Sequence, residues 1–204
     1  MTEQDSTRAD QRPYHHGDLS RILLHEAVRA IEESGAAALS LRLVARRAGV
    51  SHAAPAHHFG DKTGLLTAVA IEGYQQLEFE LSQVAEETGS FLEVGVAYVR
   101  FALDNKGFFE VMFQPELFDA NDPDLIEARA LTSRTLYGPL STPGAGDVST
   151  DALWAGVAAW SLVHGFATLW LNRVVPSGLG EDPEQAARAV LSSIFKPLPG
   201  ASGT

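Results

Sequence analysis

The chain has 204 residues, of which 45% are hydrophobic, and this is enough for one large domain or two small ones with a shared core. It contains no cysteine, so disulfide bonds and thiolate metal sites are excluded. No unbroken run of about 18 apolar residues occurs, and residues 1–17 are polar. We therefore expect neither a signal peptide nor a membrane anchor, and predict a soluble, cytoplasmic protein.

The formal net charge of −11 at pH 7 is distributed unevenly along the chain. Residues 1–64 contain eight Lys or Arg and eight Asp or Glu, whereas the other 140 residues contain seven basic and eighteen acidic residues. Six of the seven histidines also lie within residues 1–64. A nucleic acid would be repelled by the acidic part, so the neutral-to-basic N-terminal part is left to face it.

The N-terminal part begins with a charged tail, which one helix follows. We expect residues 1–13 to be a solvated tail, and an arm that follows DNA through Arg8 and Arg12 is the alternative. Apolar residues at helical spacing predict a helix over residues 18–34, which Gly35 ends.

Two short helices joined by a glycine turn are predicted over residues 41–58. Ser40 and Ser51 are suitable N-caps for them, and Gly49 can adopt the left-handed conformation that ends the first helix. The apolar residues of the first helix share one face, and its arginines should point away from that face: Arg42, Arg46 and Arg47. This is the helix-turn-helix pattern, whose second helix enters the major groove of DNA.

Six further helices are predicted in the rest of the chain, bounded by capping residues, proline or glycine. They cover residues 61–87, 90–103, 108–113, 122–138, 151–173 and 184–195. Residues 105–107 should interrupt the chain between two of them, and residues 141–150 should form a surface connection. Residues 151–173 contain all three tryptophans and are apolar nearly all round, so we expect this helix to be buried against the core and a partner subunit.

The N-terminal motifs resemble the DNA-binding domain of the TetR family of one-component bacterial repressors. The matching residues are Leu43, Ala45, Ala48, Gly49, Val50 and Ser51, then His58, Phe59, Asp61, Lys62, Leu65 and Leu66. Pro55 and Ala56 depart from the family pattern, in which a leucine and a phosphate-contacting tyrosine are usual. Trp160, His164 and Gly165 resemble the tryptophan–histidine–glycine (WHG) type of TetR C-terminal domain.

The resemblance implies an all-α homodimer with two parts. Residues 1–60 would form an N-terminal three-helix helix-turn-helix head, and residues 61–204 a C-terminal helical bundle for ligand binding and dimerisation. The last two helices would pair with those of the second subunit. The protein would be a ligand-responsive transcriptional regulator, expected to be a repressor that a small apolar or amphipathic effector releases from a pseudo-palindromic DNA operator.

The residues expected to contact DNA are polar, cationic or small residues of the head. They are Tyr14, His15, His16, Arg42, Arg46, Ser51, His52, Ala53, Ala56, His57, His58 and Lys62. The first three rest on the resemblance, since a paired histidine at this place lies near the DNA backbone in one branch of the family. Lys62 and the amides at its helix start could hold one phosphate oxygen together, and a solvated lysine is the alternative.

The C-terminal part is expected to hold an apolar effector pocket with a few polar groups. The candidate lining residues are Arg100, Phe101, Asn105, Phe108, Met112, Trp160 and His164. His164 is either an effector contact or a core histidine whose hydrogen bonds are satisfied within the protein.

We expect neither a metal site nor a cofactor, since the adjacent His57 and His58 face different sides of a helix and no metal-binding motif occurs. Catalysis is not expected either, because the sequence has no nucleophile elbow, phosphate-binding loop or dinucleotide fingerprint. Two alternatives stay open. One is a ligand-binding or protein-interaction module without sequence-specific DNA binding, and the other is an enzyme that uses His164.

Overall fold

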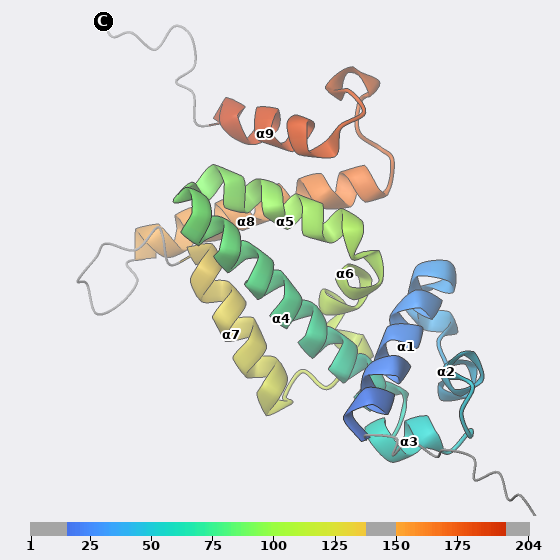
Figure 1. The fold of residues 1–204 in the computed structure, drawn as a ribbon. Helices are drawn as coiled ribbons and strands as arrows, with labels where there is room; N and C mark the ends of the chain where they lie inside the picture. The colour runs from blue at the N-terminus through green and yellow to red at the C-terminus, as the bar shows by residue number, and fades with distance from the viewer. Residues whose placement is uncertain (1–15, 138–149, 195–204) are drawn as a thin grey trace, which may run out of the picture.

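The computed structural model describes residues 16–137 and 150–194, and within those ranges every regular element is helical (Figure 1). The N-terminal group consists of α1 (His16–Ala38), α2 (Leu41–Ala48) and α3 (Ala54–Phe59). The body consists of α4 (Lys62–Thr88), α5 (Phe91–Asp104), α6 (Lys106–Met112), α7 (Pro123–Tyr137), α8 (Thr150–Leu171) and α9 (Pro183–Ile194). In Figure 1 the group α1–α3 lies at one end of the molecule and α9 at the other. The predicted all-α class is confirmed.

Side-chain caps predicted from the sequence fix the starts of five helices. Ser40, Asp61 and Ser90 each accept a hydrogen bond from the N–H three residues ahead, at 3.2, 2.9 and 3.3 Å. Asp122 and Asp182 do the same at the starts of α7 and α9, at 3.1 and 3.2 Å. Each bond satisfies a backbone donor that has no partner within its helix, and loss of such a cap costs about 1 kcal/mol of stability.

The second helix of the helix-turn-helix starts later than predicted. α3 begins at Ala54 rather than at residue 52, and no side chain caps it. In a Ser51 cap, the Ser51 hydroxyl would accept a hydrogen bond from the N–H of Ala54. Instead, this N–H donates to the main-chain carbonyl oxygen of Ser51 at 3.0 Å, and the next residue, Pro55, has no N–H. The predicted Ser51 cap is therefore wrong. The predicted interruption at residues 105–107 is also too long, because α6 already includes Lys106 and Gly107.

The core of the body forms around α5, which packs against α4, α8 and α9. Its buried side chains cover nearly its whole circumference: Val94, Val96, Ala97, Tyr98, Val99, Phe101 and Ala102. The sequence predicts that α8 is buried against the core and a partner subunit, and in the single chain α8 leaves several apolar side chains exposed. These are Leu153, Trp154, Val157 and Leu169.

α8 also has the length and composition of a membrane span over Leu153–Leu171, and it alone does so in the described part of the chain. Ser161, His164 and Thr168 interrupt its apolar residues, so this helix contains no unbroken apolar run of that length. The core helix of a soluble protein meets the same criterion, and α8 packs against α5, α7 and α9.

α6 packs closely against α1 because residue 107 is glycine. A Cβ atom at Gly107 would lie 2.8 Å from the main-chain oxygen of Val28. One turn further along α6, the Glu110 carboxylate accepts a hydrogen bond from the Ala36 N–H at 2.7 Å. Gly35 leaves helical geometry there (φ 78, ψ 158), so that the Ala36 N–H faces α6. The body therefore holds α1 at two points along its length.

Candidate nucleic-acid interface and effector cavity

The turn between α2 and α3 is formed by Gly49 and Val50. Gly49 adopts the left-handed conformation (φ 68, ψ 29), which a side chain would strain. Its N–H and that of Val50 donate to the carbonyl oxygens of Arg46 and Ala45 at 3.3 and 3.0 Å. The Val50 side chain packs against the core, so that the chain turns toward α3 at a fixed angle.

Most DNA-contact candidates that the structure describes lie exposed on α2, the turn and α3. The exposed ones are Arg42, Arg46, Ser51, His52, Ala53, Ala56 and His57. Within the described part of the chain neither Arg42 nor Arg46 forms an ion pair. His58 is half-buried, and its ring centroid lies 5.7 Å from that of His57 and 6.2 Å from that of Phe59. Guanidinium and imidazole groups placed in this way can bind phosphates or base edges.

The first three DNA-contact candidates are not placed. Tyr14 and His15 lie outside the described residues, and so does the side chain of His16.

Arg47, which was expected to point away from the apolar face of α2, lies against α1. Its guanidinium binds Glu26 at 3.0 Å and forms a two-pronged contact with Glu33 at 2.6 and 2.8 Å, both on α1. The hydrogen bond from Arg47 holds the pKa of Glu33 below its usual range. This pairing places one positive charge between two carboxylates of the head, and Arg42 and Arg46 on α2 have no acidic partner among the described residues.

Lys62 contacts the protein rather than bulk solvent alone. Its Nζ donates to the carbonyl oxygen of Ala37 at 3.0 Å. A cation is favourable at the carbonyl end of α1, and the contact ties the start of α4 to that end. The phosphate contact of Lys62 stays a prediction, and the ammonium group has two further N–H donors with which to make it.

The seven residues predicted to line one pocket do not come together. Phe101 and Met112 are fully buried core residues. Asn105 and Phe108 line a groove between α1, α4 and α6. Burial raises the pKa of Glu80, and the positive charge of the nearby Arg100 opposes this rise. Trp160 and His164 lie together at a different place.

A cavity of about 160 Å³ opens between α4, α5, α7 and α8. It is lined by Tyr74, Leu77, Tyr98, Phe113, Arg129, Thr132, Ser133, Leu136 and Trp160. We call it the Arg129 cavity. Of the predicted pocket residues, only Trp160 lines it.

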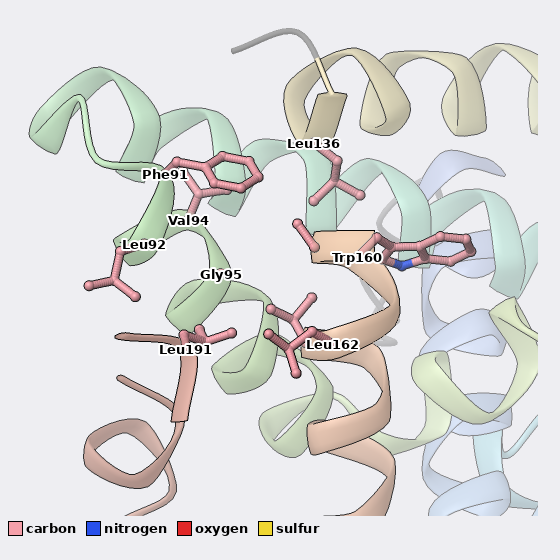
Figure 2. A pocket seen from close by; sticks show the side chains of 10 residues that line it. Phe91, Leu92, Val94, Gly95, Leu136, Trp160, Leu162 and Leu191 are labelled. Carbon is pink, nitrogen blue, oxygen red and sulfur yellow. The ribbon is translucent and has the colours of Figure 1, made fainter. Parts of the chain in front are cut away.

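A smaller, wholly apolar cleft of about 30 Å³ lies between α5, α8 and α9. Figure 2 shows Phe91 of α5, Leu162 of α8 and Leu191 of α9 around it, while the indole of Trp160 extends away from Phe91. Trp160 and Leu136 line both spaces, so they separate the cleft from the Arg129 cavity.

His164 is not one of the residues that line the Arg129 cavity, but it contacts residues that do. Its Nδ1 is 2.9 Å from the Tyr98 hydroxyl, to which Trp160 Nε1 donates at 3.2 Å. Its ring packs against Phe113 and Phe109, with centroids 4.5 and 5.1 Å away. We assign the Tyr98 O–H as donor to Nδ1, which leaves the proton of the neutral imidazole on Nε2. Burial lowers the pKa of His164 and so favours this neutral form.

Sequence reasoning missed three residues that shape the cavity. Tyr74 donates to the carbonyl of Met112 at 2.9 Å, and Arg129 lies over the Tyr74 ring. Thr132 donates to the carbonyl of Tyr74 at 3.1 Å. A tyrosine on an apolar helix face signals a buried hydroxyl that needs a partner, and this signal was available for Tyr74. The sequence contains no such signal for Arg129 and Thr132, because only the packing of α7 on α4 brings these residues to the cavity.

Within the described ranges, no group of three or more His, Asp or Glu residues lies close enough to hold a metal ion.

Two family models match the chain. Residues 23–69 match "Bacterial regulatory proteins, tetR family", and residues 91–194 match "Tetracyclin repressor-like, C-terminal domain". No curated protein sequence matches the chain.

Several solved structures share the fold. A protein with unknown function from Rhodococcus sp. RHA1 is 31% identical, with 91% of this chain and 97% of that chain covered and a TM-score of 0.73. The TetR family transcriptional regulator PfmR from Thermus thermophilus is 26% identical, with coverages of 86% and 98% and a TM-score of 0.65. NalD, the secondary repressor of the MexAB-OprM multidrug efflux pump in Pseudomonas aeruginosa, is similar in fold at 20% identity, with coverages of 88% and 94% and a TM-score of 0.58.

The lowered pKa of His164 predicts a pH dependence of stability. As the pH falls through 6.5, the usual value, the unfolded chain takes up a proton at this residue that the folded protein does not, so the free energy of unfolding decreases. His164→Gln keeps an acceptor for Tyr98 but does not titrate, and should lose part of this decrease. Urea unfolding of the native protein and of this variant, at a series of pH values on either side of 6.5, measures the decrease in the free energy of unfolding. Identical pH dependence of the two proteins would contradict the assignment.

Proposed function

This chain belongs to the TetR family of bacterial regulatory proteins, and on that basis we propose a repressor that a small amphipathic effector releases from its DNA operator. As a family member it is a soluble, ligand-responsive, DNA-binding transcriptional regulator. The observation that best supports its DNA-binding face is the exposure of Arg42 and Arg46, without acidic partners among the described residues, on a chain whose net charge is −11. A cytoplasmic location follows from DNA as the partner.

The head would bind DNA with α3 in the major groove. Arg42 and Arg46 on α2 would contact phosphates, which position the head without reading sequence. His52 and His57 can reach base edges or phosphates from the turn and from α3. Ala56 is exposed on α3 and small enough for close approach to the groove floor, where its methyl group can contact a thymine methyl.

We propose that α8 and α9 pair with the same helices of a second subunit. α8 leaves Leu153, Trp154, Val157 and Leu169 exposed, and in a soluble regulator such a face indicates a protein contact rather than a membrane span. A two-fold dimer would present its two heads to half-sites about one helical turn of DNA apart, roughly 34 Å. A pseudo-palindromic operator follows from this symmetry.

Effector binding would reach the head through α6. Phe113, directly after α6, lines the Arg129 cavity, and the same short helix holds α1 through Gly107 and Glu110. A ligand that displaces Phe113 would therefore tilt α6 and move α1, which changes the spacing of the two heads. Operator binding must then weaken effector binding by the same factor.

We assign no catalytic role to His164, since its Nδ1 is held by Tyr98 and its ring is packed among aromatic side chains. The division of the chain into residues 1–60 and 61–204 stays a prediction, and it falls between α3 and α4.

The DNA-binding proposal predicts sequence-specific, salt-dependent affinity. Fluorescence anisotropy would compare DNA from upstream of the protein's own gene with scrambled DNA, at near-physiological salt and over a series of salt concentrations around it. We expect the native site to bind at least about 1,000-fold more tightly. Arg46→Gln should weaken binding to both DNAs and reduce the slope of log affinity against log salt by about 1.

Arg134→Gln is the matched control for this experiment, because it removes the same charge from an exposed position on α7. It should leave both affinities unchanged. If the upstream DNA binds no better than scrambled DNA, a genome-wide selection supplies the candidate operators. Equal, weak affinity for every selected sequence would overturn the regulator proposal in favour of a module without sequence-specific binding.

The dimer proposal predicts that one charge on α8 separates the subunits. Trp154 is 69% exposed in the single chain, and Trp154→Glu would place a carboxylate within the proposed interface. Light scattering after size-exclusion chromatography should then report a monomer. Phe79→Glu is the control, since Phe79 is 63% exposed on α4, and this variant should stay a dimer. A dimer in both variants would place the interface elsewhere.

A further inference from the structure

The Arg129 cavity has one charged lining residue, and that residue has no counter-ion in the described part of the chain. The guanidinium carbon of Arg129 lies 5.6 Å from the centroid of the Tyr74 ring. Within the described residues no carboxylate is paired with Arg129, although its side chain is half-buried. A partly desolvated guanidinium offers planar donors that match a carboxylate, so an anionic group at this place would be favoured.

The other polar groups of the cavity already have partners within the protein. The hydroxyl of Tyr74 donates to Met112, and that of Tyr98 contacts His164 and Trp160. The two short hydroxyl side chains, Thr132 and Ser133, donate to main-chain carbonyl oxygens. A ligand therefore needs one polar group, for Arg129, and its remaining surface would contact mainly aromatic and leucine side chains.

The size of the cavity limits the apolar part of the ligand. An apolar cavity of about 150 Å³ accepts benzene, and the Arg129 cavity measures about 160 Å³. Tyr74, Tyr98, Phe113 and Trp160 supply rings against which a flat molecule can stack. A long alkyl chain would have to pass Trp160 and Leu136 to reach the apolar cleft, which holds only about 30 Å³. One aromatic ring fits without that movement.

We propose that the effector is an aryl monocarboxylate, with one ring in the Arg129 cavity and its carboxylate on the Arg129 guanidinium. Its role in releasing DNA rests on the function proposed above, whereas its binding does not. A cationic ligand is disfavoured by the charge of Arg129, and a neutral ring would bring no counter-ion for that charge.

Calorimetric titration with benzoate and with benzamide tests the ligand class. The two probes have nearly the same shape, but only benzoate carries a charge. We expect benzoate to bind with a Kd below about 1 mM, and benzamide to bind about 10- to 100-fold more weakly. This comparison needs no substitution, so it does not depend on the folding of a variant. No binding of benzoate, or equal binding of both probes, would overturn the proposal.

Two variants locate the carboxylate. Arg129→Gln should weaken benzoate about 10- to 100-fold and leave benzamide nearly unchanged. Arg134→Gln removes the same charge from an exposed position on the same helix that does not line the cavity, and should affect neither probe. An equal loss of benzoate affinity in both variants would indicate a long-range charge effect and would overturn the assignment to Arg129.

The same experiments separate this proposal from the regulator proposal. Benzoate binding is measured without DNA, and operator binding without benzoate. Specific DNA binding with no affinity for benzoate would refute the ligand class alone. Benzoate binding to a protein that reads no DNA sequence would confirm the ligand class and refute the regulator.

Discussion

The position of α6 between α1 and α4 is the constraint that relates the head to the body. Gly107 brings α6 into contact with the main chain of α1, and Glu110 accepts the Ala36 N–H at 2.7 Å. On the other side Tyr74 of α4 donates to the carbonyl of Met112 at 2.9 Å. Main-chain groups take part in all three contacts, so α6 cannot tilt without moving a neighbouring helix. A short helix held in this way can carry a displacement from the Arg129 cavity to α1.

Charge within the head is organised by one arginine. Arg47 binds Glu26 and Glu33 on α1, so these carboxylates do not face DNA as free charges. Arg42 and Arg46 on the same helix stay exposed. A head with zero formal charge can in this way present a cationic surface, while the acidic body repels DNA from the rest of the molecule. The distribution of charge over the surface matters more here than the net charge.

Local features of the fold could be predicted from the sequence, and features that depend on distant contacts could not. The Ser40 and Asp61 caps and the Gly49 turn were predictable because each depends on residues within one helical turn. The start of α3 was not predictable, because both the hydroxyl and the main-chain carbonyl of Ser51 could accept a hydrogen bond from the same N–H. In the structure the carbonyl oxygen accepts it. The Arg129 cavity was beyond sequence reasoning, because it joins side chains from helices far apart along the chain.

The link between the cavity and the head can be tested without any effector. Ser133 lines the Arg129 cavity, so Ser133→Phe would place a ring there as a built-in ligand. Measured by anisotropy on the operator, this variant should bind DNA at least about 5-fold more weakly than the native protein. In a Glu110→Ala background, which lacks the contact with Ala36, the same substitution should have little effect. A folded Ser133→Phe dimer with native DNA affinity, or an effect of equal size in both backgrounds, would contradict a link through α6.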